Sequence, residues 1–143
     1  MKAVTIMQPW ATLIATKEKL FETRSWPTKH RGKIAIHAGK KIDKNACQLP
    51  EIVEALKRHG IESMQQLPRG SVIAIANLTD CLQVIKDNGD SAELTGNVIV
   101  DEQEYTFGDF SKERYAWQLD VIKFLSVPVP AIGQLSLWNW EKC

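Results

Sequence analysis

The chain has 143 residues, 44% of them hydrophobic and 24% charged, a composition typical of one globular domain and unlike that of disordered, collagen-like or coiled-coil chains. It has no apolar run of the roughly 18 residues that would cross a bilayer. The formal net charge is +1, but residues 1–45 carry ten Lys or Arg against three Asp or Glu, a local charge of +7. This asymmetry indicates an anionic partner such as nucleic acid, unless the acidic remainder of the chain neutralises it across the folded surface.

The start of the sequence lacks the apolar core and cleavage site of a secretory signal. An odd number of well-separated cysteines, Cys47, Cys81 and Cys143, then predicts free thiols and a cytoplasmic location. The cysteines and histidines show no paired ligand spacing, and the P-loop and dinucleotide glycine patterns are absent. We therefore expect a single domain over residues 1–143, with neither a metal nor a cofactor and no contact with a membrane.

The first half of the chain alternates short strands and helices. Hydrophobic periodicity predicts strands over residues 3–7, 21–26 and 33–38. A short helix is expected after Pro9, because Trp10, Leu13 and Ile14 repeat at helical spacing. A longer helix is expected over residues 46–59, with Gly60 as its stop.

The second half reads mainly as strands. Residues 71–78 are apolar on both faces and predict a central strand, followed by a loop over 86–92. A hairpin is expected between 98–100 and 104–107, then a strand over 115–121. The prolines in 127–130 exclude a central strand, and residues 133–140 are expected to dock on the core. The pattern favours an α+β fold, a small, mostly antiparallel β-barrel with two or three appended helices; a split α+β sheet is the alternative.

Polar and aromatic residues are concentrated in three blocks near the N-terminus. They are Gln8-Pro9-Trp10-Ala11, Glu22-Thr23-Arg24-Ser25-Trp26, and Arg31-Gly32 leading to Ile36-His37-Ala38. In these blocks the sequence resembles the ASCH domain, the ASC-1 homology module of the PUA-like superfamily. A looser fourth block comprises the proline-rich turn near the end and the following stretch from Gly133 to Leu137-Trp138, so the resemblance spans most of the chain.

The resemblance implies a compact barrel with a cleft at its mouth and a role in binding nucleic acid or modified bases. Some small relatives resemble amidohydrolases acting on N4-acetylcytidine, and ribonuclease activity is attached to others. The amidohydrolase-like relatives have a threonine three residues after a lysine. Here Glu22 stands three residues after Lys19 and Thr23 follows one place later, which turns the threonine hydroxyl to the other face of the strand.

Three charged residues are candidates for the chemistry of such a cleft. Arg24 is suited to binding phosphate or stacking on a base, and alternatively forms an ion pair with Glu22 on the same strand face. Glu22 is suited to accepting a hydrogen bond from a base amino group or to general acid–base catalysis. Lys19 is either a phosphate anchor, an activated amine, or a solvated lysine.

Aromatic and polar neighbours complete the candidate set. Trp10 and Trp26 are candidate stacking platforms for a base, with core packing as the alternative for Trp10. Gln8 either reads a base edge or caps the helix.

The last three candidates are basic or titratable residues of the third strand and its flanks. His37 is either a ligand residue or a buried, hydrogen-bonded histidine. Arg31 and Lys40 belong to a basic tract that either contacts phosphates or forms a solvated face.

Three functions follow from these candidates. In the first, the cleft binds a nucleotide or flipped base of RNA or other single-stranded nucleic acid. Trp26 would stack, Glu22 and Gln8 would read polar edges, and Arg24 and Lys19 would hold phosphate or carbonyl oxygens. In the second, the protein is a small amidohydrolase or nuclease with Lys19 as nucleophile or base helper and Glu22 as general acid–base. In the third, it is a protein-interaction domain with a protein partner.

Overall fold

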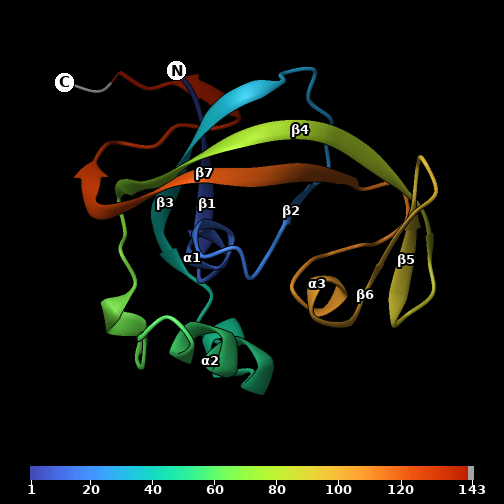
Figure 1. Ribbon diagram of the computed structural model, residues 1–143, viewed down its shortest axis with the longest axis horizontal. Coiled ribbons are helices and arrows are strands. Elements are labelled where there is room, and N and C mark those ends of the chain that lie inside the picture. The colour runs from blue at the N-terminus through green and yellow to red at the C-terminus, as the bar shows by residue number, and fades with distance from the viewer. Residues whose placement is uncertain (142–143) are drawn as a thin grey trace.

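The computed structural model describes residues 1–141, which form eight strands and three α-helices (Figure 1). The strands are β1 Lys2–Gln8, β2 Phe21–Arg24, β3 Gly32–Ile42, β4 Ser71–Asp87, β5 Ser91–Leu94, β6 Val98–Asp101, β7 Tyr115–Pro130 and β8 Leu137–Asn139. The α-helices are α1 Trp10–Ala15, α2 Pro50–Lys57 and α3 Glu102–Thr106, and short 3-10 helices cover Ala46–Gln48 and Met64–Gln66. Cys47 and Cys81 are free thiols, as predicted, and Cys143 lies outside the described residues.

The strands form one continuous path in the order β2-β7-β4-β3-β1-β8, with β5 paired to β4 and β6 paired to β5. β1 and β3 are parallel and the other pairs are antiparallel, which confirms the expected α+β class with a mostly antiparallel sheet. Within residues 1–141 the end strands β2 and β8 do not pair with each other. The predicted closure of the sheet into a barrel is therefore not confirmed.

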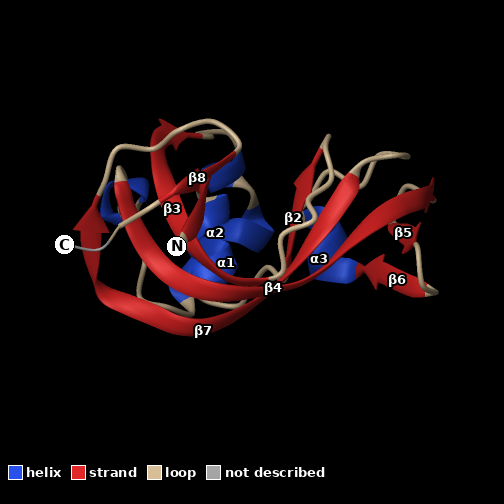
Figure 2. Cartoon of the chain, turned by 90° about the horizontal axis from the view of Figure 1, so that it is seen from above, coloured by secondary structure: helices blue, strands red, loops and turns tan. Residues whose placement is uncertain are grey.

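The two longest strands, β4 and β7, hold the fold together. They contain 17 and 16 residues and pair along most of their length, with bulges that shift the register. β4 also pairs with β3 through its first half and with β5 near its end, so it links the main sheet to the β5–β6 hairpin. Figure 2 shows both strands curving across the molecule. The predicted strand over 71–78 lies in β4 and is central, as its two apolar faces indicate.

The helices pack according to their apolar residues. α1 is buried on nearly all sides, and Leu13 and Ile14 are both fully covered. The helix expected over 46–59 is interrupted at Leu49, whose backbone is extended because Pro50 follows it. Pro50 then begins α2, and Gly60 follows its end with a φ of +76°. None of the helices in the described part of the chain is long and apolar enough to span a membrane.

The predicted hairpin between 98–100 and 104–107 is wrong. Residues 102–106 form α3, and β6 pairs with β5 instead. Long-range contacts explain the difference: the Glu104 carboxylate accepts hydrogen bonds from the backbone N–H groups of Leu20 and Phe21, and Phe107 is buried beside Leu13. The loop expected over 86–92 is also shorter, because β4 continues to Asp87 and β5 begins at Ser91.

The C-terminal part follows the sequence-based expectations. β7 continues through the proline-containing segment 127–130, where it pairs with β4 on one side, in keeping with the exclusion of a central strand. The chain then returns to β1 through β8, and Trp138 and Trp140 are buried, whereas Leu135 is 93% exposed. The predicted docking of 133–140 on the core is therefore made by residues 137–140.

Candidate binding cleft

A cleft of about 880 Å³ lies where β1, α1, β2 and β3 meet the segment that follows α3. Two of its walls, β2 and the segment that follows α3, are therefore about 90 residues apart in the sequence. The cleft is lined by Thr5, Ile6, Met7, Trp10, Lys19, Glu22, Thr23, Arg24, Gly39, Lys40, Lys41, Thr106, Phe107, Gly108, Asp109, Arg114 and Leu135. Five of these side chains are basic and two are acidic, so the lining carries an excess of positive charge that favours anionic ligands.

Lys19 lies at the bottom of the cleft and is almost completely buried. Its Nζ donates a hydrogen bond to the carbonyl oxygen of Phe107 at 2.6 Å and lies 5.8 Å from the centre of the Trp10 ring. Burial lowers the pKa of Lys19 below the usual 10.5, although the negative charges of Glu22 and Glu104 oppose that shift. An ammonium group has three donors, so Lys19 keeps donor capacity for a ligand.

Glu22 and Arg24 are two residues apart on β2, so their side chains lie on the same face of the strand, as the sequence predicts. Arg24 Nε donates to Glu22 Oε2 at 3.1 Å, and Arg24 Nη2 donates to the carbonyl oxygen of Thr5 at 2.7 Å. The arginine is thus held in place by both β1 and Glu22. Among the described residues, Oε1 of Glu22 has no hydrogen-bond partner, so this carboxylate oxygen is available as an acceptor in the cleft.

Basic residues from two further elements line the rest of the cleft. Lys40 and Lys41 on β3 are exposed and take part in no ion pair or hydrogen bond within residues 1–141. Arg114 is more constrained, since its Nε donates to the carbonyl oxygen of Asp109 at 3.1 Å and its Nη2 to that of Thr23 at 3.2 Å. The two lysines are therefore the cations most available to a ligand.

Of the nine residues predicted for the site, the structure brings five into this cleft. They are Trp10, Lys19, Glu22, Arg24 and Lys40. The other four lie outside it.

Gln8 and Trp26 are occupied by contacts within the fold. Gln8 is fully buried; its Oε1 accepts from Thr12 N, and its Nε2 donates to Thr12 Oγ1 and to the carbonyl oxygen of Pro68. The ring of Trp26 packs edge-on against Trp117, with ring centres 4.8 Å apart. Neither side chain lines the cleft.

Arg31 and His37 are held by other partners. Arg31 Nη1 donates to the carbonyl oxygens of Thr28 and His30. Its Nη2 lies 3.7 Å from Asp80 Oδ1. His37 is buried: Nε2 donates to the carbonyl oxygen of Ala131 at 2.8 Å, which leaves Nδ1 to accept from Thr5 Oγ1. Burial lowers the pKa of His37. These contacts agree with the alternative of a buried, hydrogen-bonded histidine.

The sequence-based prediction missed the wall formed by Thr106–Asp109 and Arg114. Thr106 and Phe107 belong to a segment predicted as a hairpin strand, and nothing local in the sequence connects this wall with β2. Lys41 belongs to the same basic tract as Lys40, and it also lines the cleft.

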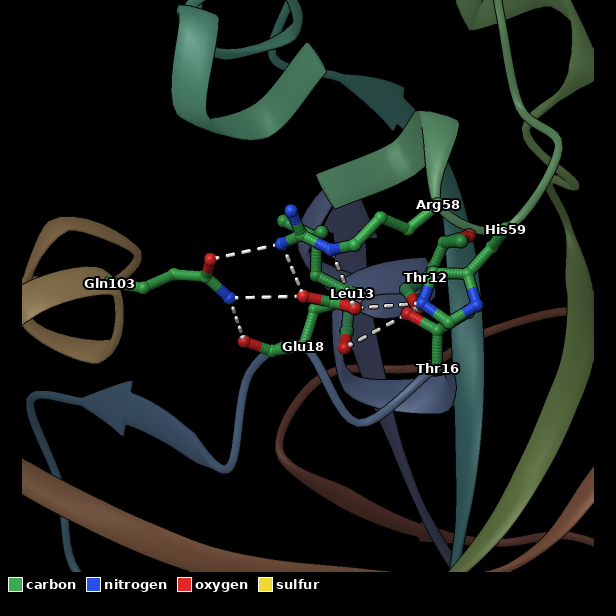
Figure 3. A network of polar contacts seen from close by, with 7 residues as sticks. All are labelled: Thr12, Leu13, Thr16, Glu18, Arg58, His59 and Gln103. Carbon is green, nitrogen blue, oxygen red and sulfur yellow. Dashed lines mark hydrogen bonds and ion pairs between the residues drawn. The ribbon is translucent and has the colours of Figure 1, made fainter. Parts of the chain in front are cut away.

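A polar network around Glu18 joins the segment after α1 to the C-terminal end of α2 and to α3 (Figure 3). Glu18 accepts hydrogen bonds from Arg58 at 2.7 Å and from Gln103 at 3.1 Å, and it lies 2.8 Å from His59 Nε2. The hydrogen bond from Arg58 is the largest cause that lowers the pKa of Glu18 to about 2. Glu18 is the neighbour of Lys19 in the sequence, and Gln103 lies one helical turn before Phe107. The network therefore helps to hold Lys19 next to the Phe107 carbonyl group in the cleft.

No group of three or more His, Cys, Asp or Glu side chains is arranged to hold a metal ion within residues 1–141. The side chains that line the cleft offer amine, guanidinium, carboxylate, hydroxyl and indole groups.

Fold and cleft together define an α+β domain with a basic ligand-sized cavity, and comparison with known proteins identifies its family. The sequence profile of the ASCH domain matches residues 4–126, and the chain belongs to that family. The chain is 33% identical over 81 residues to activating signal cointegrator 1 of Homo sapiens, and equally to that of Mus musculus. The match covers 55% of this chain and 14% of either relative, so most of their length lies outside it.

Proposed function

We propose that this ASCH domain binds single-stranded RNA and takes one nucleotide into the cleft. The observation that carries the proposal is the arrangement of groups along the cleft: an aromatic ring, a buried lysine and a carboxylate in its interior, and exposed lysines nearer the surface. Single-stranded RNA offers a base to stack and read and phosphates to neutralise. The volume of about 880 Å³ accommodates a nucleotide-sized ligand.

Each lining group has a role that matches its freedom to interact. Trp10 provides the stacking surface, because Trp26 is engaged with Trp117. The free oxygen of Glu22 accepts from a base amino group, and Lys19 donates to a base carbonyl. Arg24, which is tied to Glu22 and β1, keeps that carboxylate in position.

Phosphate contacts fall to Lys40 and Lys41. For single strands, the salt slope of the binding constant is about 0.7 per phosphate neutralised, so two contacts give a slope near −1.4 and a roughly sevenfold loss of affinity between 50 and 200 mM salt. The 2′-hydroxyl is the group through which the site would distinguish RNA from DNA.

Fluorescence polarisation with a labelled 12-nucleotide RNA and its DNA equivalent tests this proposal. The double variant K40A/K41A is expected to bind weakly and to lose most of the salt dependence. The matched control is K86A/K112A, which removes two exposed lysines that do not line the cleft. Equal loss in both double variants would show that overall charge, and not the cleft, governs binding.

The burial of Lys19 favours a second candidate, hydrolysis of an N4-acylated cytidine. A lysine whose pKa is lowered by burial has a larger share of the neutral amine, which is the nucleophilic form. In this candidate the neutral Lys19 amine takes a proton from a water molecule while the water oxygen bonds to the acyl carbon. The proton passes through Glu22 to the cytosine N4 as the acyl C–N bond breaks, which releases cytidine and acetate. Chromatography of N4-acetylcytidine incubated with the protein would reveal cytidine and acetate, and the variant K19M must abolish their formation. Binding of RNA without such turnover leaves the first candidate.

A further inference from the structure

One edge of β7 pairs with β4, and the opposite edge is open along most of its length. β2 pairs only with residues 115–118 of β7, and the contact ends at the hydrogen bond from Leu119 N to the carbonyl oxygen of Leu20. From Asp120 to Pro130, no other strand of the described chain pairs with this edge. Figure 2 shows this part of β7 running along the outside of the molecule. Such an edge presents unpaired backbone N–H and C=O groups to any extended chain.

A groove of about 480 Å³ lies against this open edge. One wall is formed by residues 121–124 of β7, and the other by the end of α1 and the loop that follows α2. Ile122 and Phe124 line the groove and are 52% and 57% exposed. A strand edge with exposed apolar side chains next to a groove is the geometry in which a peptide adds to a sheet.

The charges around the groove indicate which peptide would fit. Lys17 and Lys123 line it, both are exposed, and neither takes part in an ion pair or a hydrogen bond within residues 1–141. His59 also lines it, with its Nε2 directed to Glu18. Within residues 1–141 no aspartate or glutamate lines the groove, so its charge complements an acidic segment.

We propose that this groove binds an extended acidic peptide of a partner protein, which adds as a strand to the open edge of β7. Backbone hydrogen bonds to β7 hold the peptide, and its side chains alternate in direction. Apolar side chains on one side contact Ile122 and Phe124, and carboxylates lie near Lys17 and Lys123. The site is separate from the RNA-binding cleft, since the two share no lining residue.

The same charges argue against a second copy of this chain as the occupant. Pairing of two β7 edges would bring Lys17 and Lys123 of both copies into one region, where like charges repel. Pro128 and Pro130 also lack a backbone N–H and limit the length of edge available for a long symmetric pairing.

A phage-displayed library of random 12-residue peptides, selected on the purified full chain, is the probe. The proposal expects enrichment of peptides in which acidic residues alternate with β-branched or aromatic residues. A synthetic copy of the most enriched peptide should bind wild-type protein and bind K123E at least tenfold more weakly, with K112E as the matched control because Lys112 is exposed and lies outside the groove. In an added strand, every second backbone N–H of the peptide points toward β7. N-methylation of that set of residues should abolish binding, and N-methylation of the intervening set should leave binding nearly unchanged.

Three results would overturn the proposal. One is a selection that yields no peptides, or basic ones. Another is an enriched peptide whose affinity is the same for K123E and K112E, or that tolerates N-methylation of both sets of residues. The third is a protein that sediments as a dimer and becomes monomeric in I122K, which would assign the open edge to a second copy of the chain.

Discussion

Replacing Glu18 with glutamine tests the polar network around Glu18. The variant keeps the size of the side chain but removes the charge that Arg58 and His59 contact. The pKa of Glu18 falls from 4.5 to about 2 on folding. A shift of this size corresponds to at most about 3 kcal/mol. Because the site retains contact with solvent, which screens the charges, we expect a loss of about 1–2 kcal/mol in the free energy of unfolding at pH 7.

The stability difference between wild type and E18Q should depend on pH. The folded state lowers the pKa of Glu18, so its contribution to stability is complete above pH 4.5 and is lost as the pH falls toward 2. Urea unfolding followed by tryptophan fluorescence should therefore show a gap between wild type and E18Q that is full at pH 7 and smaller at pH 3. E62Q is the control, because Glu62 is exposed and its carboxylate forms no hydrogen bond or ion pair within residues 1–141. Equal stability of E18Q and wild type at pH 7, or a gap that does not change with pH, would show that the charge of Glu18 does not stabilise the fold.

Three further predictions concern buried residues. NMR of the ¹³C-methylated protein should show Lys19 titrating below pH 10.5; a normal titration would contradict its burial. Burial lowers the pKa of His37, so the unfolded chain binds that proton first, and wild type should lose more stability than H37Q in urea unfolding as the pH falls below 6.5. In G133A the new methyl group would lie 2.7 Å from atoms of His37 and Thr5, and we expect a loss of about 1–3 kcal/mol; an unchanged melting temperature would show that the contact relaxes freely.

Local patterns were sufficient to predict the elements whose burial follows from their own sequence. The strand at 71–78 and the short helix after Pro9 were predicted because their apolar residues follow the periods of strand and helix. The same alternation on β2 correctly placed Glu22 and Arg24 on one face. This is the part of the candidate site that one segment can specify alone.

The rest of the cleft depends on contacts between distant segments. α3 forms where alternation suggested a strand, because Glu104 binds the backbone of Leu20 and Phe21 more than 80 residues away. Trp26 has the position of a stacking platform in the sequence, but Trp117, 91 residues later, occupies its ring. Such pairings carry no local signal, so a single sequence does not reveal them.

If RNA enters the cleft as proposed, one of its bases lies against Trp10. The most direct measurement is a titration of ¹⁵N-labelled protein with a short single-stranded RNA, followed through the indole N–H signals of its five tryptophans. We expect a large shift of the Trp10 signal and an unchanged signal for Trp140, which is buried and does not line the cleft. Binding that leaves the Trp10 signal in place would contradict the proposal.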